Sequence, residues 1–222
     1  MSGQLTFDLP LTQAWQRDAF LVTSATAAAL AAVDSWQTWA NGRLLLVGPC
    51  GAGKTHLAHI WAEMAQALWV NPADLLAQLP QIAPNACVIL DDAHHVTGRA
   101  EEALFHLYNR LGPEGRLLLT APTAPRDWGL ALPDLLSRLQ AMPMARLEPP
   151  DDALLAGVLV KLFADRQITA EARLIPYLLP RMERSIAAAQ ALVMALDAKS
   201  LATQRPVTRA LAAEVLDTTA PE

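Results

Sequence analysis

The chain has 222 residues, of which 53% are hydrophobic, and its formal net charge is -5 at pH 7. This composition can supply a substantial core, whereas the acidic balance argues against a dedicated DNA-binding surface. The longest apolar stretch, 25–33, is too short to span a bilayer, and the first residues lack the pattern of a signal peptide. Because there are only two cysteines, Cys50 and Cys87, we expect a cytoplasmic protein without a disulfide framework.

The first residues are short of helix signals and include Pro10, so we expect an exposed N-terminal arm over 1–12. Further along, Ser24 or Thr26 is a suitable cap for an alanine-rich helix that continues to about Trp39.

A glycine-rich loop follows the apolar run 44–47 and matches the pattern G-x-x-x-x-G-K-[ST] without a mismatch. Its residues are Gly48, Pro49, Cys50, Gly51, Ala52, Gly53, Lys54 and Thr55. Glycines allow successive N–H groups to turn toward a phosphate, Lys54 supplies charge for the outer phosphates, and Thr55 offers a hydroxyl to Mg²⁺. His56 is expected to line the same site. The alternative is a glycine-rich turn that binds nothing.

Apolar strands and helices alternate through the first two thirds of the chain. We expect strands at 44–47, 68–70, 87–90, 116–120 and 145–147, and helices between them at 55–66, 73–79, 99–111 and 132–139. Near-continuous apolar strands separated by helices predict an α/β fold whose parallel five-stranded sheet is covered on both faces. A ligand is expected at the carboxyl ends of the strands.

Pro149 and Pro150 end this alternation, and the remaining segments are helical in pattern. The predicted helices are 151–166, 170–179, 185–203 and 208–216. The sequence therefore predicts an α/β nucleotide-binding domain over 13–149 and a small all-α lid domain over 150–222.

Two adjacent acids, Asp91 and Asp92, follow the apolar run 88–90. A carboxylate at the end of a buried strand, beside a phosphate loop, suits a magnesium shell, which is the role expected of Asp91. Asp92 is a candidate to orient an attacking water. The alternative is that the pair simply caps a helix.

Together these motifs resemble the AAA+ P-loop ATPases of the replication-initiator DnaA family, whose Walker B strand also ends in two aspartates. The segment 132–139 is similar to the family's arginine-finger box, with Arg138 flanked by Ser137 and Leu139. The resemblance implies a finger role for Arg138, although the alternative is an ordinary surface ion pair. It also places Thr120 near the nucleotide as sensor 1, despite the unusual Ala121-Pro122 that follows, and Arg184 as sensor 2, for which a surface ion pair is again the alternative. Phe20 and Val22 stand where the family's adenine pocket begins, the alternative being that they are plain core residues.

The chain ends at Glu222 without the DNA-binding domain that follows the lid in the initiator, so it resembles the Hda-type, DnaA-related regulators. In those proteins the N-terminal arm binds a sliding clamp, and here Gln4 with Leu5, Phe7 and Leu9 resembles that motif, the alternative being a disordered tail or an edge strand. The resemblance implies two partners, DnaA and the DNA polymerase III sliding clamp (beta subunit), and negative regulation of DNA replication initiation by stimulated hydrolysis of DnaA-bound ATP. The implied cofactors are ADP or ATP and Mg²⁺.

Two rival hypotheses stay open at this point. One is a self-sufficient AAA+ ATPase of helicase-loader type, which uses Asp92 as base and assembles into a homo-oligomeric ring through Arg138. The other is a nucleotide-binding module that only blocks DnaA physically. Neither sequence-specific DNA binding nor membrane attachment is expected.

Overall fold

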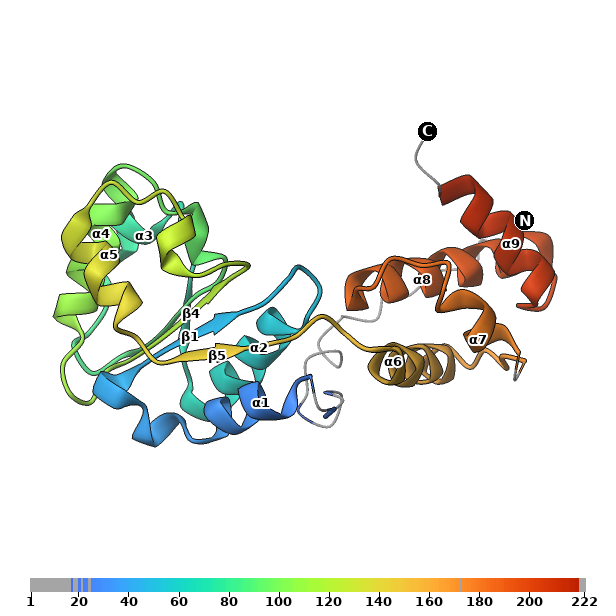
Figure 1. The fold of residues 1–222 in the computed structure, drawn as a ribbon, viewed down its shortest axis with the longest axis horizontal. Helices are drawn as coiled ribbons and strands as arrows, with labels where there is room; N and C mark the ends of the chain where they lie inside the picture. The colour runs from blue at the N-terminus through green and yellow to red at the C-terminus, as the bar shows by residue number, and fades with distance from the viewer. Residues whose placement is uncertain (1–16, 18–19, 21, 24, 172, 220–222) are drawn as a thin grey trace, which may run out of the picture.

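A computed structural model describes residues 17, 20, 22–23, 25–171 and 173–219 of the chain. It consists of a sheet flanked by helices, followed by a group of helices at the other end of the long axis (Figure 1). The chain passes from one part to the other after the last strand.

The sheet is parallel throughout and has five strands, as predicted. The strands are β1 (Arg43–Val47), β2 (Leu68–Val70), β3 (Cys87–Leu90), β4 (Arg116–Ala121) and β5 (Met144–Arg146). Their order in space is β2-β3-β4-β1-β5, so β1, which leads into the glycine-rich loop, lies between β4 and β5. The carboxyl ends of all the strands therefore meet at one edge, where the sequence predicted a ligand.

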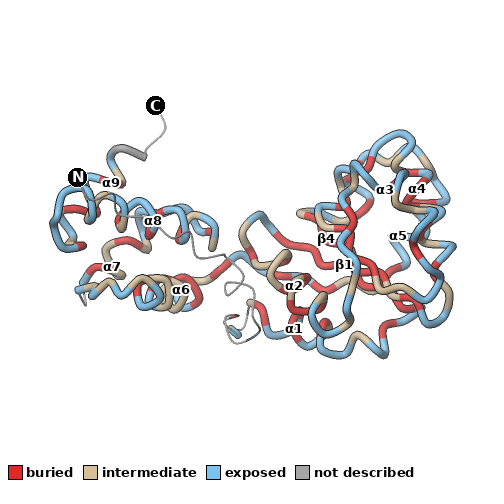
Figure 2. Tube along the Cα trace, turned by 180° about the vertical axis from the view of Figure 1, so that it is seen from behind, coloured by how far each residue is buried: buried red, intermediate tan, exposed pale blue. Residues whose placement is uncertain are grey.

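Helices cover both faces of the sheet because the strand side chains alternate between two cores. On one face lie α1 (Ala27–Asp34) and α2 (Lys54–Ala65), and on the other α3 (Leu75–Gln78), α4 (Arg99–Arg110) and α5 (Pro133–Gln140). Short 3-10 turns connect them at Trp36–Thr38, Ala40–Gly42, Leu79–Gln81, Ala93–His95 and Pro125–Asp127. In β1, Leu44 and Leu46 join the core beneath α1 and α2, whereas Leu45 and Val47 join the core beneath the other three helices. The central strands β1, β3 and β4 are buried along almost their whole length, and Figure 2 shows the buried runs within the sheet.

The first predicted helix was too long, because α1 ends at Asp34 rather than near Trp39. The chain turns instead, and Trp39 becomes buried with its ring 5.0 Å from that of Trp61. The indole Nε1 of Trp39 donates to the carbonyl oxygen of Ala32 at 2.7 Å. Burial of this large aromatic side chain outweighs the helical propensity of the alanine-rich segment.

The helices after Pro150 form a separate core. They are α6 (Asp152–Asp165), α7 (Leu174–Leu178), α8 (Ile186–Thr203) and α9 (Arg209–Thr219). Asp151 and Ser185 cap α6 and α8, accepting hydrogen bonds from backbone N–H groups three residues on. By length and composition α8 could cross a membrane, yet Leu192, Val193 and Leu196 pack into this core. We refer to α6–α9 as the lid.

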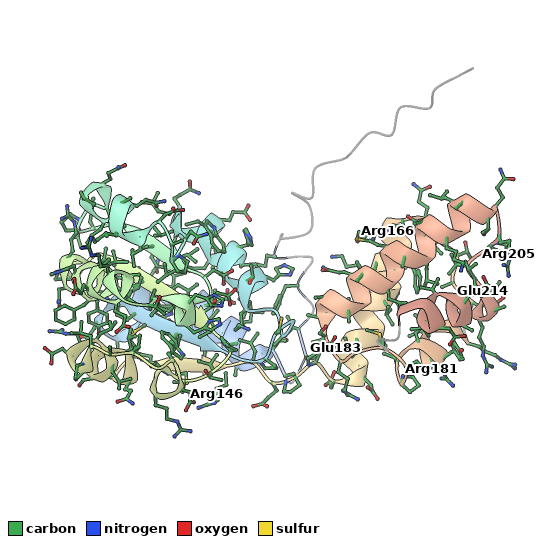
Figure 3. All side chains as sticks on the ribbon, turned by 90° about the horizontal axis from the view of Figure 1, so that it is seen from above. Arg146, Arg166, Arg181, Glu183, Arg205 and Glu214 are labelled. Atoms are coloured by element: carbon green, nitrogen blue, oxygen red, sulfur yellow. The ribbon has the colours of Figure 1, made fainter. Side chains whose placement is uncertain are left out.

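Ion pairs join α8 to α9 at the end of the lid remote from the sheet (Figure 3). Glu214 lies 3.1 Å from Arg205 and 3.4 Å from Lys199. The hydrogen bond from Arg205, followed by that from Lys199, lowers the pKa of the Glu214 carboxyl. Because these side chains are exposed, the pairs contribute little to stability.

Candidate nucleotide-binding site

The glycine-rich loop connects β1 to α2, which begins at Lys54. Gly51 and Gly53 have φ angles of 72° and 101°, in the region that side chains disfavour. The sequence expectation that glycines shape this turn thus has a geometric basis. The turn places the amino end of the 12-residue helix α2 at the loop, where its free N–H groups favour an anion.

Lys54 lies buried against its own loop. Its Nζ donates to the carbonyl oxygens of Gly48 at 2.7 Å and Pro49 at 2.9 Å. Burial lowers the pKa of Lys54, and the nearby Asp92, Cys50 and Asp91 partly oppose that shift. A phosphate in the loop would supply the counter-charge that the buried ammonium lacks.

Asp91 at the end of β3 joins three parts of the site. Its carboxylate accepts a hydrogen bond from the Thr55 hydroxyl at 3.0 Å and one from the Thr120 hydroxyl at 2.5 Å. Thr120 lies on the adjacent strand β4 and also accepts from the Asp92 backbone N–H at 2.9 Å. The residues expected at a magnesium shell, Thr55 and Asp91, are therefore in direct contact.

The chemistry of these donors fits Mg²⁺. A hydroxyl and a carboxylate are hard oxygen ligands, and Mg²⁺ characteristically takes only one or two protein ligands, with water and phosphate completing its shell. Among the described residues there is no group of three or more His, Cys, Asp or Glu side chains that could hold a metal ion.

Asp92 adopts a left-handed backbone conformation, with φ 50° and ψ 44°, and its side chain is 55% exposed. The Nδ1 atom of His94 lies 4.0 Å from its carboxylate. Burial lowers the pKa of His94, and His95 adds to the shift while Asp92 opposes it. Asp92 is thus the accessible acid of the pair, as a water-orienting role requires.

A hollow of about 880 Å³ lies beside these acids, at the carboxyl ends of β2 and β3. Asp91 and Asp92 form one wall, and Asn71, Asp74 and His95 contribute to the others. It extends the site away from the glycine-rich loop toward the edge strand β2.

Phe20 and His56 meet on the other side of the glycine-rich loop. Their ring centroids are 5.1 Å apart in an edge-to-face arrangement, and Phe20 Cε2 lies 3.4 Å from where a Cβ atom of Gly53 would be. Phe20 is buried, whereas Val22 is 59% exposed. Of the two residues expected near the adenine, Phe20 is in contact with the loop region, whereas Val22 is exposed.

The lid touches the glycine-rich loop directly. The N–H of Ile186, the first residue of α8, donates to the carbonyl oxygen of Gly51 at 3.2 Å, and Ser185 packs against Gly51. The neighbouring Arg184 forms an ion pair with Asp152 at the start of α6, with 2.9 Å between Nη2 and Oδ1. Sequence reasoning anticipated neither the contact of Ser185 with the loop nor the pairing of Asp152, because both depend on how two lid helices pack at their amino ends.

Arg138 lies far from this site. It is exposed on α5, and its guanidinium stacks on Tyr108 near the end of α4. The backbone carbonyl of Tyr108 is bonded to Arg43, the first residue of β1, whereas the glycine-rich loop follows the last residue of β1. The structure therefore brings together the loop, the two aspartates, Thr120, Phe20 and the start of the lid, but not Arg138.

The residues of the expected clamp motif, Gln4, Leu5, Phe7 and Leu9, lie outside the described part of the chain. Their role stays a prediction.

No family model matches the chain. Among solved structures, domain III of the Thermotoga maritima replication initiation protein DnaA matches with a TM-score of 0.82 and 17% identity, over 95% of this chain and 98% of that one. AMPPCP-bound DnaA from Aquifex aeolicus matches with a TM-score of 0.71 and 17% identity, over 85% and 67% of the two chains. A Thermotoga maritima RuvB variant matches with a TM-score of 0.71 and 17% identity, over 92% of this chain and 72% of that one. The chain thus has the AAA+ fold found in domain III of DnaA.

Proposed function

We propose that this protein is a DnaA-related regulator of the Hda type, which binds an adenine nucleotide with Mg²⁺ and stimulates hydrolysis of the ATP held by DnaA. The outcome is negative regulation of DNA replication initiation. The observation that carries the proposal is the position of Arg138, exposed and at the opposite end of β1 from the glycine-rich loop.

The length of β1 supports this assignment. The strand has five residues, which span about 13 Å at the usual rise per residue. Arg138 is therefore not directed at the phosphates that its own loop would bind. A nucleotide-linked role for this arginine must be exerted on a nucleotide in a neighbouring molecule, as an arginine finger is in trans.

The nucleotide assignment is supported by the loop and by the acids beside it. Lys54 and the amino end of α2 suit phosphates, and Thr55 and Asp91 suit Mg²⁺. The DnaA structure from Aquifex aeolicus, whose fold this chain shares, contains the ATP analogue AMPPCP. We therefore assign ADP or ATP as the nucleotide.

The remaining parts of the proposal concern the partner complex. Residues 4–9 would dock on the beta sliding clamp on DNA, residues 13–149 would present Arg138 to DnaA, and residues 150–222 would close over the nucleotide. Such a protein acts in the cytoplasm, where its partners work.

A self-sufficient ATPase of helicase-loader type is the second candidate. The proximity of Lys54, Asp91 and the exposed Asp92 favours it, since these groups could support turnover on the protein's own nucleotide. In that case Arg138 would act between copies of this chain in a ring.

Phosphate release from ATP-bound DnaA tests the proposal, measured with and without the DNA-loaded clamp and this protein, beside this protein's own ATP turnover. Stimulation only when both are present supports the regulator. Arg138→Ala should abolish it while retaining association, whereas Arg126→Ala, which removes an arginine exposed elsewhere, should not. Brisk turnover by this protein alone, with DnaA unaffected, would establish the second candidate. Association that blocks initiation without changing DnaA turnover would favour the physical blocker.

A further inference from the structure

One face of α4 is directed at α5, the helix that carries Arg138. Glu101, Phe105 and Tyr108 follow one another at spacings of four and three residues, which places them on the same side of the helix. Each of them contacts α5 or the segment that leads into it. The structure thus couples α4 to α5 at several points along their length.

Glu101 fixes the start of α5. The side chain is only 5% exposed, and its Oε2 accepts hydrogen bonds from the N–H groups of Ala131 at 2.9 Å and Leu132 at 3.1 Å. Leu132 is the residue immediately before α5. A carboxylate bound to backbone N–H groups at this end of a helix makes a strong, directional contact, so the entry of α5 is set by α4.

Phe105 and Tyr108 fix the Arg138 side chain. The guanidinium carbon lies 5.2 Å from the Phe105 ring centroid and 5.6 Å from that of Tyr108. Both distances are within the range of a cation–π contact. The neighbouring residues Leu135 and Leu139 of α5 are fully buried, so the helix cannot rotate to present Arg138 differently.

Tyr108 is itself held by a second arginine, Arg43. The Arg43 guanidinium carbon lies 5.0 Å from the same ring centroid, and the side chain is only 4% exposed. It donates to the carbonyl oxygens of Tyr108 at 3.0 Å and Leu111 at 2.8 Å, and also to those of Gly42 and Gly115. Arg43 thus connects the end of α4 to the start of β1 by hydrogen bonds. The Tyr108 ring packs against this buried, hydrogen-bonded arginine.

We infer that Tyr108 is a positioning residue for Arg138. Together with Phe105, Tyr108 holds the Arg138 guanidinium in one orientation before a partner binds. The inference rests on the proposed function of Arg138. An unconstrained surface arginine samples many rotamers. Restricting it to one rotamer when a partner docks costs conformational entropy, which weakens the interaction with that partner. Stacking on two rings restricts those rotamers in advance while leaving the N–H donors at the guanidinium edge available to a phosphate.

The test compares Tyr108→Leu, Tyr108→Phe, Arg138→Ala and the double variant Tyr108→Leu/Arg138→Ala in the DnaA phosphate-release assay with DNA-loaded clamp. Tyr108→Leu should lower the maximal stimulated rate by about three- to tenfold, the scale of a cation–π contact, with little change in half-maximal concentration. Tyr108→Phe retains the ring and should keep most of the stimulation. The double variant should be no worse than Arg138→Ala alone, because Tyr108 acts through that residue.

Tyr177→Leu is the matched control. Tyr177 also carries stacked arginines, Arg181 at 4.1 Å and Arg209 at 4.5 Å, but it lies on α7 in the lid. This variant should stimulate as the unaltered protein does, and circular dichroism would verify that every variant is folded.

The outcomes separate the inference from the function on which it rests. If Arg138→Ala stimulates normally, the proposed function is wrong. If Arg138→Ala is inactive but Tyr108→Leu is fully active, or if Tyr108→Phe is as impaired as Tyr108→Leu, the positioning role of Tyr108 is wrong while the function stands. A half-maximal concentration that rises with an unchanged maximal rate would likewise overturn it, because Tyr108 would then be a docking contact.

Discussion

Thr120 on β4 donates its hydroxyl hydrogen to the Asp91 carboxylate at the end of the neighbouring strand β3, over 2.5 Å. The same hydroxyl oxygen accepts the N–H of Asp92 at 2.9 Å. The fully buried Thr120 side chain thus orients Asp91, the expected magnesium ligand. It also supports the left-handed backbone conformation of Asp92.

Replacing Thr120 by valine should therefore destabilise the protein although the two side chains have similar shapes. The change leaves the Asp92 N–H without its acceptor and removes one donor from Asp91, at a cost of about 1–3 kcal/mol in the free energy of unfolding. Urea denaturation measures this loss. Thr120→Ser keeps the hydroxyl and should recover most of it, and equal losses in the two variants would assign the effect to packing instead.

Removal of Mg²⁺ should weaken nucleotide binding through the contact between Thr55 and Asp91. We expect chelation by EDTA to reduce ATP affinity in the unaltered protein, measured by fluorescent-nucleotide titration. The Asp91→Asn variant should start with lower affinity and respond less to EDTA, since it lacks the carboxylate of the shell. An unchanged EDTA response in Asp91→Asn would remove Asp91 from the magnesium site.

Much of the fold was predictable because the signals for it are local. The five apolar strands and the helices between them were placed within a few residues, since near-continuous apolar runs broken by helical segments leave few alternatives to a buried parallel sheet. The end of α1 was misplaced because the burial of Trp39 against Trp61 depends on a contact distant in sequence. The predicted helix 170–179 was likewise longer than α7, which spans only Leu174–Leu178.

The glycine-rich loop and the acids Asp91 and Asp92 of the candidate site were predictable, because the spacing of residues in these motifs determines their local geometry. The bonds of Thr120 to Asp91 and Asp92 were not, because they require the register between β3 and β4. Asp152 could not be linked to Arg184 for a similar reason, since 32 positions of sequence separate two residues that meet only when α6 and α8 pack together.

The pair formed by Asp152 and Arg184 should compete with a nucleotide for the arginine. Asp152→Asn removes the charge that holds Arg184, so we expect nucleotide affinity to rise by about two- to threefold, the modest effect of an exposed ion pair. Arg184→Ala should lower it. Asp197→Asn, which breaks the ion pair between Asp197 and Arg166 elsewhere in the lid, is the control and should leave the affinity unchanged. A fall in affinity for Asp152→Asn would show that Asp152 helps rather than competes.

The stability of the protein should decrease as the pH falls below about 6.5, through His59 and His94. Burial lowers the pKa of both imidazoles below the ordinary value of 6.5. The unfolded chain then binds more protons than the folded protein in this pH range. The free energy of unfolding therefore decreases as the pH decreases. Thermal denaturation between pH 7.5 and 5.5 measures the slope. Because the His59 ring packs 4.4 Å from that of Trp69, His59→Gln should be less stable at neutral pH but should show a shallower slope.

The close contact between the glycine-rich loop and the lid requires glycine at position 51. A Cβ atom at this position would lie 2.6 Å from the Cβ atom of Ser185, closer than side chains can approach. Gly51→Ala should therefore displace the lid from the loop and weaken nucleotide binding by about tenfold or more, in addition to the strain of a positive φ. Gly98→Ala is the matched control, since Gly98 has a φ of +55° but no atom within 4 Å of the added methyl group. It should lower thermal stability through strain while retaining nucleotide affinity, so equal affinities in the two variants would mean that the lid contact does not contribute to binding.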